Sequence, residues 1–165
     1  MIIRNIYLND RSNLERLIIE NNNQDMYWMY DIDSDLNTLI AQNITNKTPN
    51  QSYCIIMDTN LVGFVHFYNY DENNNTVFMG YLLDKEYQGK GIMIDACMKI
   101  IPMIFENYTV KEIIVITVQD NTKSKSLIHK LGFKQTEQFY VKDKEFEIYY
   151  LQKSNYSLKT SKLWH

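Results

Sequence analysis

The sequence predicts a single α+β domain of mixed α/β character, built on a mixed and mostly antiparallel sheet. The chain has 165 residues, which suits one domain with a substantial core. An apolar strand at 77–83 passes through a glycine turn into an amphipathic helix that extends to Phe105. Strand pairs with hairpin signals stand on both sides of this unit, and no internal repeat or proline- or glycine-rich linker divides the chain.

The composition excludes several classes of protein. Hydrophobic residues make up 45% of the chain, charged residues 22%, and the net charge is −3. So mild a balance gives no reason to expect binding to nucleic acid or to an anionic membrane. We expect a cytoplasmic protein, because the sequence shows no signal peptide and no apolar run of membrane-spanning length. Cys54 and Cys97 have no metal-ligand spacing, so we expect buried free thiols.

The first third of the chain is predicted to hold a strand and two helices. The strand covers 2–8, and Asn9 and Asp10 offer a cap for the first helix. The second helix begins near Ser34. An aromatic cluster at 26–30 precedes it, and core packing of these rings is the simplest interpretation.

A β-hairpin is predicted next. Strands at 53–57 and 61–68 are joined by a turn at 58–60. His66 lies in the second strand, where we expect it to be exposed on the sheet or hydrogen-bonded rather than to transfer protons.

The helix after the glycine turn contains Pro102, which removes one backbone hydrogen bond, so we expect a kink or an early helix end. The elements expected after it are a strand at 112–118, a helix from Asn121 to Leu131 that ends at Gly132, hairpin strands at 134–141 and 145–151, and a tail at 154–165. The domain is therefore assigned to residues 1–153.

The turn Gln88-Gly89-Lys90-Gly91 is typical of an anion site. The first four amides of a helix lack internal partners, and the helix dipole places about half a positive charge there. Phosphate binds well at such a position. Glycine lets the backbone amides approach a bulky anion, while Lys90 and Gln88 add a charge and a side-chain amide. An ordinary strand-to-helix turn would contain the same residues.

Spacing separates three phosphate-binding patterns. The P-loop fails because no serine or threonine follows Lys90. The dinucleotide pattern is weak because Ile94 stands where the third glycine belongs. The acyl-coenzyme A pyrophosphate loop, Q/R-x-x-G-x-G/A, fits from Gln88 to the start of the helix, except that Met93 fills the last small position.

The segment 80–93, followed by Asn121, Ser124 and Leu131-Gly132-Phe133, resembles the GNAT superfamily of coenzyme A-dependent N-acetyltransferases. The run Tyr-Gln-Gly-Lys-Gly-Ile-Met at 87–93 and the Asn-x-x-Ser spacing are similar to the branch that acetylates the N-terminal amines of ribosomal proteins. The strong part of the resemblance covers residues 76–135, and elsewhere only the order of the elements matches.

The resemblance implies a fold and a co-substrate. The fold has a central sheet of six to seven strands, splayed between strands 4 and 5 and flanked by about four helices. The co-substrate is acetyl-CoA, and no metal is implied. Main-chain groups of Tyr81, Leu82 and Leu83 would pair with its pantetheine arm, and Asn121 would bind the arm, cap its helix, or do both. The pyrophosphate would be held by Gln88, Gly89, Lys90, Gly91, Ile92 and Met93.

Acetyl transfer to an amine requires a neutral amine, a stabilised oxyanion and a proton for the leaving thiolate. By resemblance, a backbone N–H near Leu83 stabilises the oxyanion. Most relatives protonate the thiolate with a tyrosine at the position of Ile128, which cannot donate a proton. Ser124 is then the candidate catalytic proton donor, or a helix-capping serine. No general base stands out, and the weak candidates, which also suit a solvated surface, are Glu86, Asp71 and Glu137.

The acceptor is expected to be a primary amine. A protein N-terminal α-amine, with a pKa of about 7.7 to 8.0, demands less of a base than a lysine at about 10.4. A polyamine or an antibiotic is the rival acceptor. The acidic run at 31–35 offers one patch for a polyamine, but an acidic helix start favoured by the helix dipole is the preferred interpretation of that run. By resemblance Tyr27, Trp28 or Tyr30 would contact the amine, and a homodimer is left open. Two further classes are a coenzyme A-binding sensor without turnover and a nucleotide-binding oxidoreductase.

Overall fold

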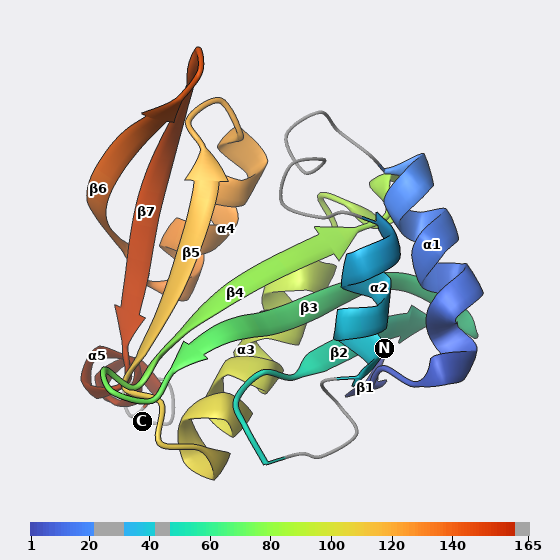
Figure 1. Cartoon of the computed structure of the whole chain (residues 1–165), viewed down its shortest axis with the longest axis horizontal. Coiled ribbons are helices and arrows are strands. Elements are labelled where there is room, and N and C mark those ends of the chain that lie inside the picture. The colour runs from blue at the N-terminus through green and yellow to red at the C-terminus, as the bar shows by residue number, and fades with distance from the viewer. Residues whose placement is uncertain (22–31, 42–46, 161–165) are drawn as a thin grey trace.

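The computed structural model describes residues 1–21, 32–41 and 47–160, and Figure 1 shows the arrangement of its elements. The strands are β1 (Ile2–Asn5), β2 (Ser52–Met57), β3 (Asn60–Asp71), β4 (Thr76–Leu83), β5 (Glu112–Val118), β6 (Lys134–Val141) and β7 (Lys144–Gln152). The helices are α1 (Arg11–Glu20), α2 (Ile32–Ala41), α3 (Ile92–Asn107), α4 (Thr122–Leu131) and α5 (Lys153–Thr160), with short 3₁₀ turns at Leu8–Asp10 and Lys85–Tyr87.

The strands form one seven-stranded sheet in the order β1-β2-β3-β4-β5-β7-β6. Every neighbouring pair is antiparallel except β4 and β5, which are parallel. This confirms the prediction of a mixed and mostly antiparallel sheet. The hairpin turn between β2 and β3 has positive φ at both Asp58 and Thr59, as the two-residue turn that suits the twist of a hairpin requires.

The sheet splays between β4 and β5, as expected. The two strands pair only over the first three residues of each, and the last pair is Phe78 with Ile114. Beyond that point β4 continues to Leu83 and β5 to Val118 without pairing with each other, and Figure 1 shows the two strands diverging. Among the described strands, β3 alone therefore pairs with the C-terminal end of β4, beyond Phe78.

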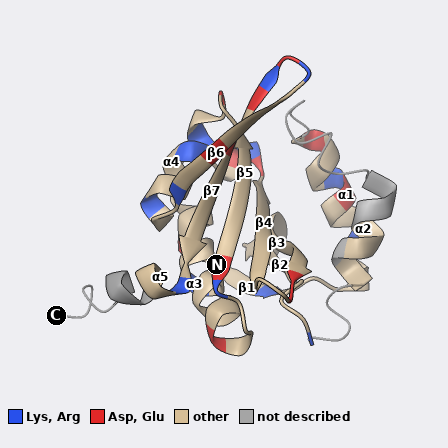
Figure 2. Cartoon of the chain, turned by 60° about the vertical axis from the view of Figure 1, so that its left-hand side comes forward, with Lys and Arg blue, Asp and Glu red and all other residues tan. Residues whose placement is uncertain are grey.

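Helices cover both faces of the sheet, with α1 and α2 on one side and α3 and α4 on the other (Figure 2). Alternation of side chains along the strands divides the core accordingly. Phe64 and Leu82 join the cluster formed with α1 and α2. Val65 and Met79 join the larger cluster under α3 and α4, which also contains most of the apolar residues of α3.

We expected Pro102 to cause a kink or an early helix end. Helix α3 runs through Pro102 to Asn107, so the alternative of an early end was wrong. Proline has no N–H, and the carbonyl of Met98 therefore lacks its helical donor. The hydroxyl of Tyr156, on α5, donates to that carbonyl at 3.5 Å, and its ring packs 5.8 Å from that of Phe105. Burial of α3 along most of one side holds the helix together across the missing bond.

The chain termini differ from the expectations. The first strand ends at Asn5 rather than Leu8. Asp10 stands at the start of α1 but makes no side-chain cap there, because its carboxylate accepts hydrogen bonds from both guanidinium nitrogens of Arg4 and from the amide of Tyr7. Residues 154–160, predicted as a tail, belong to α5, and the rest of that tail lies outside the described residues.

The expectations for the two cysteines and for His66 are met. Cys54 and Cys97 are buried free thiols. His66 is buried, its Nδ1 lies 2.8 Å from the hydroxyl oxygen of Ser52, and its ring stacks on that of Tyr68. This matches the hydrogen-bonded alternative. In the described part of the chain, no helix has the length and apolar character that crossing a membrane requires.

Candidate active site

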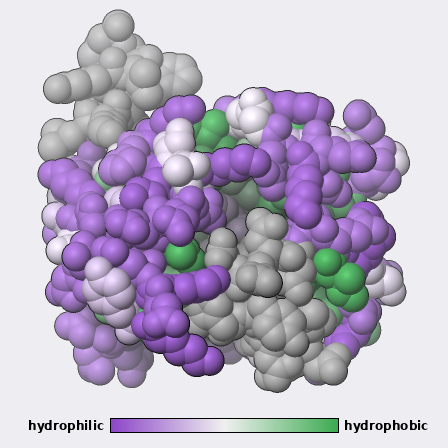
Figure 3. All heavy atoms as spheres, turned by 90° about the horizontal axis from the view of Figure 1, so that it is seen from above, coloured by the Kyte–Doolittle hydropathy of each residue, from purple (hydrophilic) through white to green (hydrophobic). Residues whose placement is uncertain are grey.

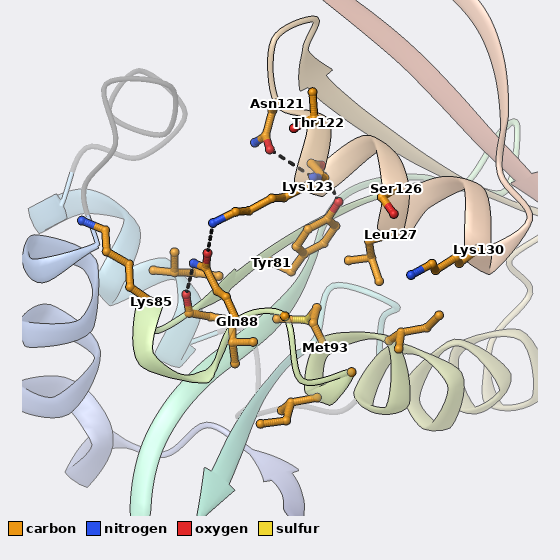
Figure 4. A pocket seen from close by; sticks show the side chains of 17 residues that line it. Tyr81, Lys85, Gln88, Met93, Asn121, Thr122, Lys123, Ser126, Leu127 and Lys130 are labelled. Atoms are coloured by element: carbon orange, nitrogen blue, oxygen red, sulfur yellow. Dashed lines mark hydrogen bonds between the residues drawn. The ribbon is translucent and has the colours of Figure 1, made fainter.

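A cleft of about 640 Å³ lies between the C-terminal end of β4, the start of α3 and one side of α4 (Figure 4). Of the residues predicted to bind the co-substrate, all but Lys90 line it, and the candidate proton donor Ser124 lines it as well. Lys90 is exposed and holds its ammonium 5.5 Å from the centre of the Tyr87 ring. Most of the surface in the view of Figure 3 is hydrophilic, with only scattered apolar patches.

The loop before α3 has the backbone shape of an anion-binding turn. Gly89 and Gly91 have φ angles of +75° and +78°, a region that disfavours residues with a Cβ. Nothing lies within 4 Å of the position that a Cβ would occupy at either residue. The first intrahelical bond runs from the amide of Asp95 to the carbonyl of Gly91. The amides of the first turn of α3 therefore have no helical acceptors and open onto the cleft.

Gln88 fixes the near wall of this loop. Its Nε2 donates to the carbonyl of Leu83 at 2.9 Å, and its Oε1 accepts from the ammonium of Lys123 at 3.0 Å. Figure 4 shows this chain of contacts running from β4 to α4. Gln88 therefore joins the strand end, the glycine loop and α4 at the mouth of the cleft.

The backbone of β4 offers hydrogen-bonding groups to the cleft. The amide of Asp84 donates to the carbonyl of Val62, and this bond flanks the pairing of Leu83 with Gly63. In an antiparallel ladder, that places Leu83 at a position whose own N–H and C=O point away from β3. The alternation assigns Tyr81, two residues earlier, to the same orientation. Main-chain groups of Tyr81 and Leu83 therefore face the splayed side of the sheet.

The side chain of Tyr81 reaches α4, which sequence reasoning missed. Its hydroxyl lies 2.6 Å from the hydroxyl of Ser124. Burial raises the pKa of the Tyr81 phenol above its ordinary value, and the hydrogen bond with Ser124 acts in the opposite direction. Only the main chain of Tyr81 was expected to matter, because 43 residues separate it from Ser124 and no sequence pattern links them.

Asn121 caps α4, as its sequence position predicted. Its Oδ1 accepts from the amide of Ser124 at 3.0 Å, and this cap does not use its Nδ2. Because Asn121 supplies the cap, the hydroxyl of Ser124 is not needed for that purpose. Ile128, at the position where relatives carry a tyrosine, is fully buried in the core.

The electrostatics of the cleft favour an anionic ligand. Lys85, Lys123 and Lys130 line it, and no carboxylate does so among the described residues. Figure 2 shows the basic residues along α4. Of the weak general-base candidates, Glu86 is exposed on the 3₁₀ turn, Asp71 caps the turn at the other end of β4, and Glu137 is exposed on β6. None of the three lines the cleft.

A family model described as an acetyltransferase (GNAT) domain matches residues 1–134. The chain belongs to this family. The predicted resemblance is therefore confirmed over most of the chain, and it extends beyond residues 76–135 to the first strand and the helices α1 and α2.

Particular relatives fit this assignment. A protein of Bacillus subtilis (strain 168) named "Putative ribosomal N-acetyltransferase YdaF" is 32% identical over 79 residues, which cover 48% of this chain and 43% of that protein. The structure of RimL, the ribosomal L7/L12 alpha-N-protein acetyltransferase, in complex with coenzyme A has a TM-score of 0.76 at 15% identity, covering 91% of this chain and 92% of that one. A mutant of the spermidine N-acetyltransferase SpeG from Vibrio cholerae has a TM-score of 0.79 at 17% identity, covering 97% and 99%.

Within this GNAT domain, one network holds α4 against the sheet. Both carboxylate oxygens of Glu147, on β7, lie within 3.1 Å of the ammonium of Lys125. Tyr149 donates its hydroxyl to the same carboxylate at 2.7 Å. Burial acts to raise the pKa of Glu147, but the bonds from Tyr149 and Lys125 outweigh it and hold the pKa below its ordinary value. Lys125 adjoins Ser124, so this network sets the position of the candidate proton donor.

Proposed function

We propose that the protein transfers an acetyl group from acetyl-CoA to a primary amine, with a protein N-terminal α-amine as the favoured acceptor. One observation carries the proposal. A single cleft joins the free amides at the start of α3 to the backbone groups of β4 that face the splay. An extended ligand with phosphates at one end and amide groups along its length matches both parts.

The residues present fit such a ligand. The pyrophosphate would accept hydrogen bonds from the amides of the segment 88–93, where the glycine turn leaves open space. The amides of the pantetheine arm would pair with the main chain of Tyr81 and Leu83, as an additional strand would. Asn121 would use its Nδ2 on the same arm. The lysines that line the cleft would attract the phosphates from solution.

The chemistry is a direct attack on the thioester that acetyl-CoA supplies. The lone pair of the amine nitrogen forms a bond to the acetyl carbon, and the carbon–sulfur bond breaks. The N–H of Leu83 would stabilise the oxyanion that forms between these events. The amine gives up one proton to solvent, and Ser124 provides a hydrogen bond or proton to the departing sulfur. A thiolate with a pKa near 8.5 needs only modest assistance of this kind.

The α-amine is favoured as acceptor for two reasons. Its pKa of about 7.7 to 8.0 leaves part of it neutral at physiological pH, so a weak base is enough, and no carboxylate lines the cleft in the part of the chain that the structure describes. A polyamine carries several positive charges and would need acidic partners. The rings at 26–30 and the acidic run at 31–35, for which acceptor contact was the less favoured alternative, have side chains outside the described residues.

An acceptor screen tests this proposal. Release of free thiol from acetyl-CoA is followed with peptides that have a free N-terminus and no lysine, with the same peptides N-acetylated and carrying one lysine, and with spermidine. We expect turnover with the first group at rates well above the other two. Faster turnover of spermidine would replace the proposed acceptor by a small amine. Tight binding of acetyl-CoA without turnover of any amine would indicate a sensor instead.

A further inference from the structure

We propose that Tyr81 is a positioning residue for acetyl transfer, because its hydroxyl donates to Ser124 and thereby turns the Ser124 O–H toward the leaving sulfur. The inference rests on the proposed function and assigns a role to a side chain that the sequence pattern did not indicate. It depends on the contact between two hydroxyls inside the cleft, 2.6 Å apart.

The contact between Tyr81 and Ser124 lies in the cleft. Tyr81 lies past Phe78, the last residue of β4 that pairs with β5. Figure 4 shows the Tyr81 side chain directed toward α4, and its hydroxyl there lies within hydrogen-bond distance of the hydroxyl of Ser124. Both residues line the cleft, so a ligand that lies along β4 passes over this pair. The contact is therefore within reach of the atoms that react.

The direction of this hydrogen bond follows from the acidity of its two hydroxyls. A phenol is a stronger acid than an aliphatic alcohol, so the favoured arrangement has Tyr81 as donor and Ser124 as acceptor. The amide of Ser124 is already bonded to Asn121, which fixes the start of α4. With its oxygen accepting from Tyr81, the serine keeps its own O–H for another acceptor. In a chain of this kind each hydrogen bond strengthens the next one.

The bonds and charges of the reaction balance with Ser124 as the donor. The amine nitrogen bonds to the acetyl carbon, the carbon–sulfur bond breaks, and its electron pair stays on sulfur. Ser124 donates its O–H to that sulfur, and Tyr81 stabilises the negative charge that grows on the serine oxygen. The proton lost by the amine returns to the pair through solvent, so no oxidant, reductant or further reactant is needed. A raised pKa keeps the Tyr81 phenol protonated throughout the working pH range.

The alternative role for Tyr81 is packing. Its ring contacts the larger core cluster, and removal of the hydroxyl leaves that contact in place. Tyr81→Phe therefore separates the two roles. The chain also offers a control in Tyr70, whose hydroxyl donates to Oδ1 of Asn75 at 3.1 Å and lies 2.9 Å from the hydroxyl of Thr109, at the opposite end of the sheet. Tyr70→Phe removes a hydrogen-bonded tyrosine hydroxyl far from the cleft.

A double-mutant cycle tests the inference. Values of kcat and of KM for acetyl-CoA are measured for the wild type, Tyr81→Phe, Ser124→Ala, the double variant and Tyr70→Phe, with circular dichroism and Tm as checks on folding. We expect a loss of about fivefold in kcat for Tyr81→Phe, about tenfold for Ser124→Ala and about tenfold for the double variant. The KM for acetyl-CoA should stay within twofold, and Tyr70→Phe should match the wild type in kcat.

The outcomes separate this inference from the proposed function. A loss of about fiftyfold in kcat for the double variant, the product of the two single losses, would show that Tyr81 does not act through Ser124. A Tyr81→Phe variant with wild-type kcat would overturn the role outright while the proposed function stands. A wild-type protein that binds acetyl-CoA but acetylates no amine would overturn the proposed function, and this role with it.

Discussion

The ammonium of Lys123 on α4 lies 3.0 Å from Oε1 of Gln88 on the loop before α3. The same glutamine donates to the carbonyl of Leu83 at the end of β4. The end of β4 and the loop that follows it are thus connected to α4, 35 residues further along the chain, at one end of the cleft. A positive charge held at this point suits a ligand whose phosphates lie beside it.

Removal of that charge should weaken binding of coenzyme A. Lys123→Gln should raise the Kd for acetyl-CoA by about fivefold at low salt, and the difference from the wild type should shrink as salt is added, because screening weakens exposed charges. Isothermal titration calorimetry at two salt concentrations measures both effects. Lys111→Gln is the control, since Lys111 lies at the opposite end of the sheet. Equal losses in the two variants would show a general effect of net charge.

Gly91 and Gly63 should respond differently to alanine. At Gly91 a Cβ meets nothing, but φ is +78°, so Gly91→Ala should cost about 1 kcal/mol of folding stability, or roughly 2 to 4 °C in Tm. At Gly63 a Cβ would lie 2.6 Å from the carbonyl oxygen of Leu82, so the backbone of β3 or β4 must move. Gly63→Ala should therefore lower Tm further.

Acetyl-CoA binding should be weakened more by Gly91→Ala than by Gly63→Ala, since a Cβ at Gly91 would enter the space in front of the amides at the start of α3. Gly91→Ala should weaken acetyl-CoA binding more than its loss of stability suggests. Thermal unfolding with and without acetyl-CoA gives both quantities. An undiminished shift of Tm by the ligand in Gly91→Ala would contradict this location of the pyrophosphate.

Acid should destabilise the protein through His66 before its carboxylates titrate. Burial lowers the pKa of His66 to about 3, whereas an unfolded histidine titrates near 6.5. The unfolded state therefore takes up a proton first as the pH falls. The stabilising contribution of neutral His66 is complete above pH 6.5 and is lost as the pH approaches 3, at up to about 1.4 kcal/mol per pH unit. Urea unfolding of the wild type and His66→Gln should diverge in slope between pH 6.5 and 4.5. Parallel profiles would show that another group governs this range.

Loss of the Glu147 charge should loosen α4. Glu147→Gln leaves the ammonium of Lys125 beside a neutral amide and weakens the bond from Tyr149, so we expect a loss of about 2 kcal/mol in the free energy of unfolding. Because Lys125 adjoins Ser124, kcat should fall as well. Chemical denaturation and steady-state kinetics measure the two effects. Glu145→Gln provides the control, because Glu145 is partly exposed on the same strand and its carboxylate accepts a hydrogen bond from Tyr140 rather than from α4. Full stability of Glu147→Gln would mean that the network does not hold the helix.

The sequence predicted those parts of the fold whose determinants are local. Strand β5 has the predicted bounds, and α4 begins after Asn121 and ends at Gly132 because the residues at each end act on their own neighbours. The sequence also predicted the glycine turn and most of the residues at 81–93 that line the cleft, because they lie in one continuous segment.

The failures involve partners that lie outside the helix or strand concerned. Pro102 did not end α3, since burial of that helix and a hydrogen bond from Tyr156 offset its missing N–H. Asp10 does not cap α1, because Arg4 holds its carboxylate. The hydroxyl pair of Tyr81 and Ser124 arises only when β4 separates from β5 and brings α4 over the strand. No local pattern encodes such a pairing.

We propose that one cleft holds the phosphates of acetyl-CoA at the start of α3 and its pantetheine arm along β4. A crystal structure of the protein with acetyl-CoA measures this directly. We expect the pyrophosphate oxygens to lie within hydrogen-bond distance of the amides at 89–93. We expect the thioester sulfur to lie beside Ser124, between β4 and β5. A nucleotide bound elsewhere on the protein, or no binding at millimolar acetyl-CoA, would contradict it.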